Sequence, residues 1–348
     1  MTKPRVVLGL SGGVDSAVAA VLLLEAGYEP YAVTLRLWPP AAETALSAAQ
    51  AVAEHLHLPW RTVDLSERFR QRIVEPFIEA YSTGRTPNPC VLCNPQVKLW
   101  ALLAEANRLG AQWVATGHYA RLRREADGTV HLLAGRDPRR DQSYFLYRLP
   151  QSMLRRLLLP LGEMRSKAEV RALARDRALP LVAERRDSQD LCFIAGGDYR
   201  RFLRDRRPDA FRPGPIVTTD GRVVGEHRGL PAYTIGQRKG LGIGSDERLY
   251  VVGMERATRT LIVGPLSALL RETAALEAVV FTAGEPEALP LPLQVRIRHR
   301  APLAAATLER EEEGWRLRFA RPQRGLAPGQ SAVFYRGEEV IGGGFFAD

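Results

Sequence analysis

The sequence predicts an α/β protein in which a doubly wound parallel sheet comes first and smaller β-rich units follow. Between residues 5 and 116, short apolar runs alternate with helical patterns, as in a parallel sheet covered by helices. After Pro208 the pattern changes to glycine-rich turns between short apolar strands. We therefore predict three domains: an α/β domain at 1–207, a small mixed or β domain at 208–273 and a β-barrel at 274–348.

The elements of the first domain follow one another in regular order. In a sheet of this kind, ligands bind beyond the carboxyl ends of the strands. The loops after the strands are therefore the places to look for a site. We expect strands at Arg5–Leu10, Tyr31–Leu37, Trp60–Leu65 and Trp113–Thr116, helices at Ala17–Glu25, Ala41–Leu56, Glu67–Tyr81 and Gln96–Leu109, and a Pro/Gly-rich loop at Ser82–Pro95.

The remaining elements are less regular. Arg121–Arg136 is typical of a hairpin that turns at Asp127-Gly128. Helical patterns then continue to about Arg207, and glycines up to Gly244 separate short strands of the second domain. From Ala274 to Asp348 the chain consists of short strands and turns, which indicates a small barrel.

Composition places the chain among ordinary globular proteins. Its 348 residues exceed what one core usually organises, and 45% of them are hydrophobic and 25% charged. No apolar run reaches the roughly 20 residues that a membrane-spanning helix needs. The first residues, Met1 to Arg5, run directly into a strand and leave no room for a signal peptide. We expect a cytoplasmic protein without membrane contact.

The net charge is +10, and nearly all of the positive charge is arginine. Such a charge favours a polyanionic partner, because each neutralised phosphate releases condensed counterions. Genomic composition bias is an alternative explanation for the preference of arginine over lysine. Charge alone does not separate RNA from DNA or from an anionic surface.

A glycine loop lies between the first strand and the first helix. Adjacent glycines let the backbone approach an anion closely, and the helix that follows offers unpaired N–H groups to pyrophosphate. Serine hydroxyls add donors, and Asp15 is a candidate ligand for Mg²⁺. The alternative is a simple turn that caps a helix. The loop resembles the PP-loop of ATP pyrophosphatases, which leave AMP on their substrates, and it reads Gly9-Leu10-Ser11-Gly12-Gly13-Val14-Asp15-Ser16.

Three cysteines are too few for a disulfide framework. Cys90 and Cys93 lie in the Pro-rich loop, and Cys192 follows about 100 residues later. One interpretation is sulfur chemistry, in which one cysteine carries a persulfide and another attacks or resolves it. A [4Fe–4S] cluster on the three cysteines, structural zinc and three inert thiols are the alternatives.

Several motifs together resemble the tRNA 2-thiouridylases, the sulfurtransferases that act on the wobble uridine of tRNA. They occur in every predicted domain, so the resemblance covers essentially the whole chain. Beside the glycine loop they are Thr86-Pro87-Asn88-Pro89 with Cys93-Asn94, Ala115-Thr116-Gly117-His118-Tyr119, Asp141-Gln142-Ser143-Tyr144-Phe145-Leu146, Asp187-Ser188 before Cys192-Phe193-Ile194, Thr234-Ile235-Gly236-Gln237-Arg238-Lys239-Gly240 and Pro328-Gly329-Gln330-Ser331-Ala332-Val333-Phe334-Tyr335.

The resemblance implies a role for each matching position. Cys93 corresponds to the nucleophile and Cys192 to the cysteine that carries the persulfide. Gly9 to Ser16, Leu35 and Gly117 correspond to the ATP site. Asn88, Pro89 and Cys90 correspond to the place of the target base, and the positions corresponding to tRNA contacts are His118, Arg140, Asp141, Gln142, Arg298, His299 and Gln330.

The implied reaction begins when ATP transfers AMP to the uracil 2-oxygen. Sulfur from Cys192 then replaces that oxygen, AMP leaves, and a Cys93–Cys192 disulfide remains. ATP and Mg²⁺ are the implied cofactors, and the implied partners are a tRNA with a wobble uridine and a sulfur-donor protein, either a cysteine desulfurase or a sulfur relay protein. One departure matters: many family members have aspartate where this chain has Cys90.

Basic residues outside these motifs fit an RNA partner. If Arg296, Arg298 and Arg300 alternate along one strand, their guanidinium groups share one face suited to phosphates. A solvated strand face is the alternative. The competing functions are another adenylating enzyme with the same loop, which needs no cysteine pair, and a non-catalytic tRNA-binding module, which needs no intact glycine loop.

Overall fold

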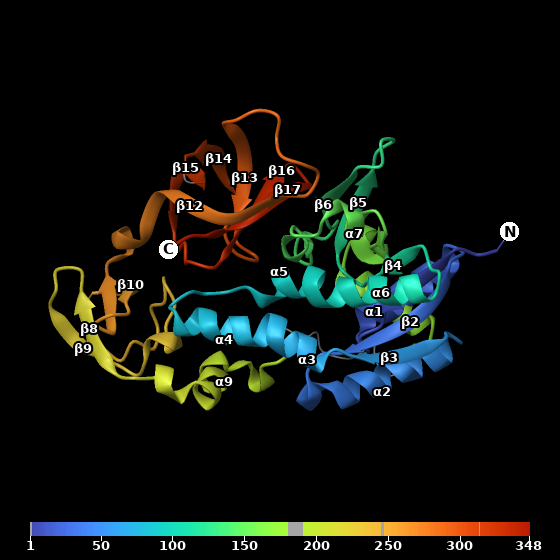
Figure 1. Ribbon diagram of the computed structural model, residues 1–348, viewed down its shortest axis with the longest axis horizontal. Coiled ribbons are helices and arrows are strands. Elements are labelled where there is room, and N and C mark those ends of the chain that lie inside the picture. Colours follow the sequence, from blue (N-terminus) through green and yellow to red (C-terminus); the bar gives the residue numbers. More distant parts are fainter. Residues whose placement is uncertain (1, 180–190, 245–246, 313) are drawn as a thin grey trace.

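The protein is described by a computed structural model that covers residues 2–179, 191–244, 247–312 and 314–348. Three units are visible, as expected (Figure 1). The α/β unit occupies the right of that view and extends leftward beneath the barrel through α4 and α9; the barrel lies at the upper left, and a small β unit lies at the far left.

The first unit is a doubly wound parallel sheet, which confirms the predicted fold class. Its strand order is β3-β2-β1-β4-β7, and all four pairings are parallel. The order reverses direction between β1 and β4, so the loops that follow these two strands border the crevice where such sheets bind ligands. The strands are β1 (Arg5–Gly9), β2 (Glu29–Arg36), β3 (Trp60–Asp64), β4 (Trp113–Ala115) and β7 (Leu157–Leu158).

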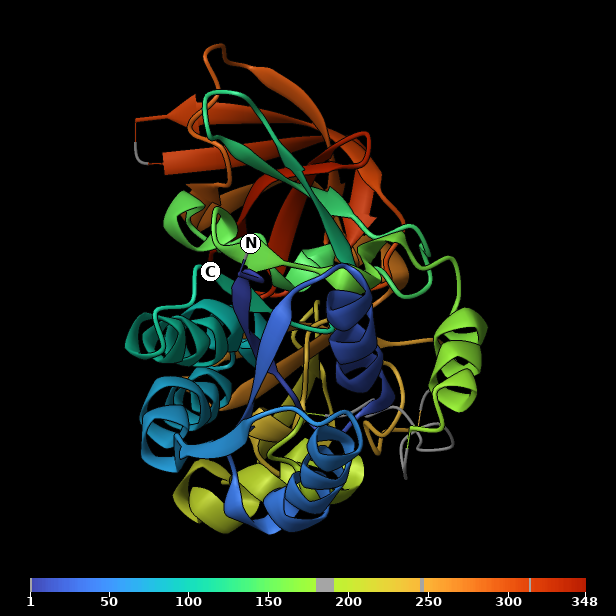
Figure 2. The ribbon, with the colours of Figure 1, turned by 90° about the vertical axis from the view of Figure 1, so that its right-hand side faces the viewer.

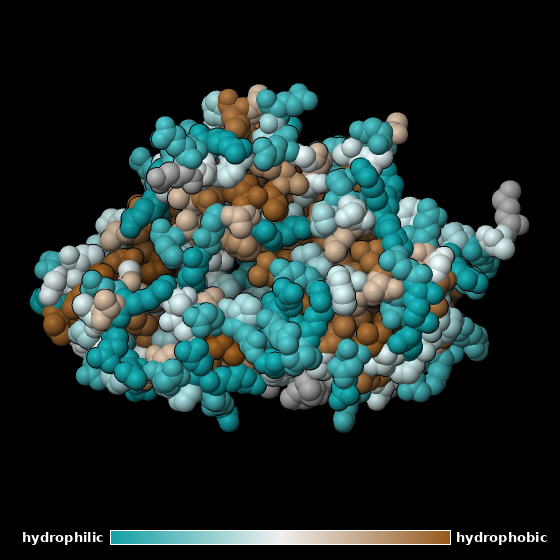
Figure 3. All heavy atoms as spheres, in the orientation of Figure 1, coloured by the Kyte–Doolittle hydropathy of each residue, from teal (hydrophilic) through white to brown (hydrophobic). Residues whose placement is uncertain are grey.

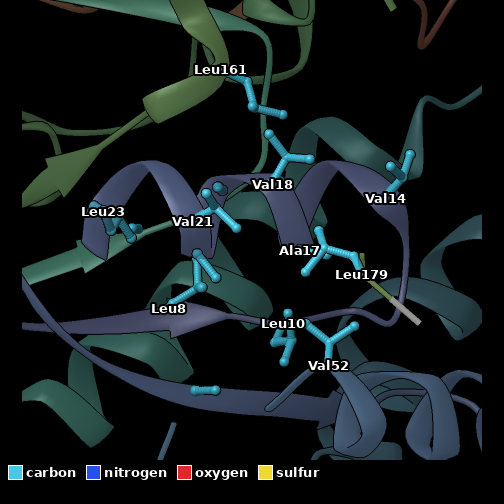
Figure 4. Close-up of a cluster of buried hydrophobic side chains, with 14 of the residues drawn as sticks. Leu8, Leu10, Val14, Ala17, Val18, Val21, Leu23, Val52, Leu161 and Leu179 are labelled. Carbon is cyan, nitrogen blue, oxygen red and sulfur yellow. The ribbon is translucent and has the colours of Figure 1, made fainter. Parts of the chain in front are cut away.

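Side chains of β1 alternate between two buried faces. Val6 and Leu8 pack against α1 (Val14–Glu25) and α2 (Pro39–His55), whereas Val7 packs with residues of α6 (Trp100–Arg108) on the opposite face. Figure 4 shows Leu8 and Leu10 facing the apolar side of α1. Each such side chain contributes about 1.5–3 kcal/mol of burial. This core fixes the start of α1 against the end of β1, which holds the glycine loop in place.

The helical run that carries two cysteines begins earlier than predicted. The expected loop ends at Asn88, and α5 (Pro89–Cys93) continues through a π-helical segment, η2 (Asn94–Leu99), into α6 (Trp100–Arg108). Proline is tolerated at the first helical position, so Pro89 starts this helix rather than preventing it. Pro95 lacks an N–H and would clash in a regular α-helix, and the wider turn relieves that clash.

The expected helical pattern up to Arg207 is wrong for much of its length. Two longer helices do form: Ser166 caps α8 by accepting from the Glu169 N–H, and Asp198 caps α9. The stretch before α8 consists mainly of turns and short helical pieces. The remaining helical elements of the α/β unit are α3 (Ser66–Phe69), η1 (Arg70–Val74), α4 (Glu75–Ser82), η3 (Ser143–Phe145), α7 (Gln151–Leu154), η4 (Pro160–Glu163), α8 (Lys167–Asp176), η5 (Ala195–Gly197) and α9 (Tyr199–Arg206).

The second unit is small and mainly β, as predicted. Its four-stranded sheet has the order β10-β11-β8-β9, in which only the β11–β8 pairing is parallel among the described residues. Its elements are η6 (Pro208–Ala210), β8 (Gly214–Thr218), β9 (Val223–His227), η7 (Leu230–Ala232), β10 (Tyr250–Glu255), β11 (Thr260–Gly264) and η8 (Leu266–Leu269).

The third unit is a closed barrel, as predicted. Its strands follow the order β12-β15-β14-β13-β16-β17, and a β12–β17 pairing closes the ring. Strand β12 begins at Leu270, before the predicted start of this domain at residue 274. The strands are β12 (Leu270–Phe281), β13 (Leu291–Arg296), β14 (Ala304–Glu311), β15 (Gly314–Arg324), β16 (Ser331–Arg336) and β17 (Glu339–Phe346).

The predicted hairpin forms, but it belongs to the barrel sheet. Strands β5 (Ala120–Arg124) and β6 (Val130–Ala134) pair with each other, and β6 continues the sheet by pairing with β17. Figure 2 shows the hairpin beside the barrel, above the α/β unit. The first and third units are therefore joined by shared backbone hydrogen bonds.

The predicted arginine face is wrong. Strand β13 ends at Arg296, and Arg298 and Arg300 lie beyond it, with Arg300 at a positive φ of 66°. The Arg296 guanidinium points inward and pairs with Asp141 at 2.9 Å. Arg298 and Arg300 are exposed, so only these two remain available for phosphates.

The outer surface is mostly polar. Figure 3 shows hydrophilic side chains over most of one face, with smaller apolar patches between them. Within the described part of the chain, no helix has the length and apolar character to cross a membrane.

Candidate active site

The glycine loop connects β1 to α1 and is held by its own serines. The Ser16 hydroxyl accepts from the Ser11 N–H at 3.0 Å and donates to the Gly13 carbonyl at 3.0 Å. Gly12 has a φ of +72°, and a Cβ there would lie 2.3 Å from the Ala45 carbonyl oxygen. Only glycine fits between the loop and α2. The predicted nucleotide loop is therefore a tight turn at the N-terminus of a helix, a geometry suited to phosphate.

The loop after β4 packs directly on the glycine loop. A Cβ on Gly117 would lie 2.9 Å from the Asp15 carbonyl carbon and 2.9 Å from the Ser16 nitrogen. Gly117 and the residues from Gly9 to Ser16 thus occupy one location, at the point where the strand order reverses. Leu35 is half-buried near the end of β2, the strand adjacent to β1.

A lysine that sequence reasoning missed reaches this loop from α8. The ammonium of Lys167 lies 2.8 Å and 2.7 Å from the two carboxylate oxygens of Asp15, and the Tyr119 hydroxyl donates to Asp15 at 2.5 Å. The Lys167 side chain is only 9% exposed. Because 152 residues separate it from Asp15 along the chain, no local pattern could have revealed it.

These contacts bear on Mg²⁺. Lys167 contacts both carboxylate oxygens of Asp15 in this arrangement. A carboxylate offers about four lone pairs, so these contacts leave acceptor capacity for a metal ion, and the Mg²⁺ site on Asp15 stays a prediction. Lys167 adds positive charge beside the loop.

The three cysteines differ in exposure. Cys93 is buried, Cys90 is partly exposed and Cys192 is exposed. Burial raises the pKa of the Cys93 thiol to about 12, an effect that nearby Lys98 opposes. Desolvation also raises the pKa of Cys90 and of Cys192, again against the charge of Lys98.

Lys98 is a second residue that sequence reasoning missed. Burial works to lower its pKa, but charge interactions with Cys93, Cys192 and Cys90 outweigh burial and raise it. The π-helical segment explains its position, because residues five apart lie nearly above one another in a helix with i→i+5 hydrogen bonds. Lys98 is five residues after Cys93 and so shares its face. In a regular α-helix the two side chains would diverge.

His118 lies in the loop after β4, which packs on the glycine loop. It follows Gly117, and burial together with the charge of Lys98 lowers its pKa to about 3. Its Nδ1 lies 2.8 Å from the Thr116 hydroxyl. His118 is therefore a neutral side chain in the loop after β4. We define Cys90, Cys93 and Cys192 as the cysteine group.

Exposure and pKa together predict an order of thiol reactivity. With iodoacetamide at pH 8, we expect Cys192 to react first, Cys90 next and Cys93 slowest, by at least about tenfold relative to Cys192, because Cys93 is buried and remains protonated. Mass spectrometry of timed digests measures the order. Equal rates for Cys93 and Cys192 would contradict this assignment of exposure.

The barrel forms hydrogen bonds with the segment that leads into α5, the helix that carries Cys90 and Cys93. The Thr86 N–H donates to the Pro328 carbonyl at 2.8 Å, and the Gln330 side-chain amide donates to the Thr86 carbonyl at 2.9 Å. Gln330, a predicted tRNA contact, therefore has an internal role. Tyr144 bonds to the Asn88 side chain and to the Ser331 carbonyl, and Pro89 is buried at the helix start.

The other predicted tRNA contacts gather around the segment 140–145. Asp141 is 4% exposed and accepts from Gly135, Ser143 and Arg296, so its carboxylate is committed to internal contacts. Gln142 accepts from the Tyr119 N–H at 3.0 Å. The His299 ring lies 4.4 Å from the ring of Phe145. Arg140 is partly exposed and Arg298 is exposed, as a phosphate contact requires. The Asp187-Ser188 motif lies outside the described residues.

The iron–sulfur alternative finds no support in the donor arrangement. Among the residues that the structure describes, no three His, Cys, Asp or Glu side chains are placed to hold a metal ion. The cysteine group in this arrangement does not fit a cluster, and we derive no step from one.

Comparison with known proteins places the chain in a family. Three family profiles cover it: the tRNA methyl transferase HUP domain at 4–196, the tRNA methyl transferase PRC-barrel domain at 200–265 and the aminomethyltransferase beta-barrel domain at 271–346. The tRNA-specific 2-thiouridylase MnmA of Roseiflexus castenholzii is 44% identical over 99% of both chains. That of Chloroflexus aurantiacus is 45% identical over 99% of this chain and 98% of the other.

Solved structures resemble the chain more distantly. The U34-tRNA thiolase NcsA from Methanococcus maripaludis, solved with its [4Fe-4S] cluster, is 19% identical and covers 60% of this chain and 67% of its own, with a TM-score of 0.37. A 4-thiouridine synthetase–RNA complex is 18% identical and covers 59% of this chain and 51% of its own, with the same TM-score. The full-length sequence matches decide the assignment: the chain is a PP-loop enzyme of the tRNA-specific 2-thiouridylase family.

Proposed function

We propose that this enzyme uses ATP to replace the 2-oxygen of a tRNA wobble uridine with sulfur, giving 2-thiouridine, AMP and pyrophosphate. The packing of two loops carries the proposal. Gly117, in the loop after β4, packs on Asp15 and Ser16 of the glycine loop. Cys93 lies in one apolar cluster with Phe193, the residue after Cys192, and Leu35 of β2 packs against that cluster. These contacts support an adenylating site close to a sulfur-carrying site.

The first step is the transfer of AMP. The triphosphate binds at the N-terminus of α1, where free N–H groups and the helix dipole favour negative charge. The uracil 2-oxygen attacks the α-phosphorus, the bond to the β-phosphate breaks and pyrophosphate leaves. Lys167 lies beside the same turn, so its ammonium offsets the charge that develops on the leaving phosphates.

The second step is the transfer of sulfur. A sulfur-donor protein loads Cys192 with a persulfide, and the exposure of Cys192 makes it the accessible acceptor. The terminal sulfur attacks the uracil C2, and the oxygen leaves with AMP. Cys93 gives up its proton as it attacks the inner sulfur, a deprotonation that the charge of Lys98 favours; the sulfane sulfur is thereby reduced and a Cys93–Cys192 disulfide remains.

The candidate RNA contacts are arginines that are exposed or partly exposed. Arg140, Arg298 and Arg300 are candidates for phosphate contacts, and the net charge of +10 favours the association. The target base enters beside Asn88, Pro89 and Cys90, where the barrel anchors the preceding loop through Thr86. The single-stranded anticodon loop lets a base turn out at low cost.

The test is thiolation of an unmodified tRNA transcript with ATP and a persulfide donor, in wild type and Cys192→Ala. We expect wild type to form 2-thiouridine with AMP and pyrophosphate, and the variant to form no 2-thiouridine while it still releases pyrophosphate. Glu287→Gln, an exposed change far from the cysteines in sequence, is the control. Full thiolation by Cys192→Ala would overturn the persulfide role of Cys192, and thiolation by neither protein would overturn the function.

A further inference from the structure

Cys90 and Cys93 are placed to form a disulfide of their own. They lie three residues apart at the start of one continuous helix, so they share a face, and Cα atoms at this spacing fall within the range that disulfides accept. Cys90 lies in the first turn, where backbone N–H groups have no partner inside the helix. That turn can adjust to bring the two sulfur atoms together.

The third thiol lies within the same electrostatic environment. Cys192 contributes to raising the pKa of both Cys90 and Cys93, and Cys90 contributes to raising that of Cys93. Cys93 also lies in one apolar cluster with Phe193 and Ile194, the two residues that follow Cys192, so packing brings the Cys192 segment to the helix that carries Cys93. The charge of Lys98 works to lower the pKa of all three thiols, which favours whichever sulfur carries the negative charge during exchange.

The three thiols differ in how easily solvent and other proteins reach them. The proposed sulfur transfer ends with a bond between Cys93, which is buried, and Cys192, the exposed thiol that must meet the next sulfur donor. A reductant from solution reaches Cys93 poorly. The partly exposed Cys90 reaches it from the same helix face.

We propose that Cys90 is a resolving cysteine that regenerates Cys192 after each sulfur transfer. The Cys90 thiolate attacks the Cys93 sulfur of the Cys93–Cys192 disulfide. A Cys90–Cys93 bond forms, the Cys93–Cys192 bond breaks, and Cys192 leaves as a thiolate that takes up a proton. An external dithiol then reduces the Cys90–Cys93 bond and is itself oxidised to a disulfide. This inference rests on the proposed function, which supplies the first disulfide.

Trypsin separates the two disulfides cleanly. Cleavage after Arg85 and Lys98 leaves Cys90 and Cys93 in one peptide, 86–98, and cleavage after Arg186 and Arg200 leaves Cys192 in another, 187–200. A Cys90–Cys93 bond therefore keeps peptide 86–98 unalkylated and uncrosslinked, with Cys192 alkylated. A Cys93–Cys192 bond crosslinks the two peptides.

The first experiment follows one turnover. The full-length enzyme, carrying a persulfide on Cys192, reacts with ATP and an unmodified transcript without reductant, and is then acid-quenched, treated with N-ethylmaleimide and digested. We expect the internal Cys90–Cys93 disulfide in wild type and the crosslinked peptides in Cys90→Ser. Crosslinked peptides as the main product of wild type would overturn the proposal.

A steady-state measurement adds a kinetic readout. With dithiothreitol present, Cys90→Ser should lower the ratio of steady-state rate to first-turnover rate by on the order of tenfold, because the buried disulfide must wait for an external thiol. Dividing the steady-state rate by the first-turnover rate cancels any effect that the substitution has on the first turnover. An unchanged ratio would count against a resolving role.

An arm without substrates separates this proposal from the function. Wild type, Cys90→Ser and Cys192→Ala are equilibrated in oxidised and reduced glutathione and analysed in the same digest. We expect the Cys90–Cys93 disulfide in wild type and Cys192→Ala, and crosslinked peptides in Cys90→Ser. If tRNA is not thiolated but this pattern appears, the proposed function fails and the Cys90–Cys93 redox pair stands. If the wild-type digest contains the crosslinked peptides instead, the redox pair is overturned whether or not tRNA is thiolated.

Discussion

Lys167→Met is expected to slow pyrophosphate release by about 10²–10³-fold, the loss typical of removing one preorganised group that stabilises developing charge. Lys167 is the cation that touches the glycine loop through Asp15, and its side chain is buried there. Its charge is in place before ATP binds, so no reorganisation is needed when the phosphates separate. The measurement is single-turnover pyrophosphate release with saturating tRNA.

A second variant separates two explanations of that loss. Without Lys167, the Asp15 carboxylate would repel the phosphates, so the double variant Lys167→Met with Asp15→Asn removes the repulsion. If Lys167 acts on the phosphates themselves, the double variant stays slow. Recovery close to the wild-type rate would show that Lys167 only neutralises Asp15. Lys3→Met, an exposed lysine at the N-terminus, controls for loss of a positive charge.

Asp141→Ala is expected to destabilise the protein by about 3–5 kcal/mol, because it leaves a partly buried guanidinium without its partner. Asp141 joins the segment before η3 to the barrel: it accepts from two backbone N–H groups and from Arg296 at 2.9 Å. The Arg296 Nε has no hydrogen-bond partner, so the remaining charge would keep only its stacking contact with the Tyr335 ring, 5.0 Å away. Urea unfolding midpoints of wild type and variant measure the effect.

Two comparisons test the cause of this destabilisation. Asp141→Asn keeps an acceptor for the backbone N–H groups and loses only the charge, so we expect a smaller shift than for alanine. Asp127→Ala, in the exposed turn of the β5–β6 hairpin, should change stability little. A shift below about 1 kcal/mol for Asp141→Ala would mean that Arg296 finds another partner or reaches water.

Local sequence patterns were sufficient for the parallel sheet, the β5–β6 hairpin, the barrel and the glycine loop. The alternation of strands and helices predicts the parallel sheet because strands buried on both faces read as apolar runs. The loop at Gly9–Ser16 can be predicted from the sequence because its geometry depends on residues close together in the chain. The glycines allow the tight turn, and the serines form hydrogen bonds within the loop. The helix that carries Cys90 and Cys93 could not be predicted from the sequence. Pro89 and Pro95 indicate a loop, unless Pro89 occupies the first helical position and a π-helical segment accommodates Pro95.

The sequence by itself determined the domain order, the glycine loop, the three candidate thiols and the family to which the chain belongs. Only the tertiary structure decided that Lys167 neutralises Asp15, that Lys98 shares a face with Cys93, and that Asp141 and Gln330 hold the barrel against the α/β unit. The physical reason is the sequence separation between the interacting residues. Turn geometry and strand patterns depend on residues within a few positions of one another, whereas a buried charge must be paired, and its partner is chosen by packing between elements far apart in the chain.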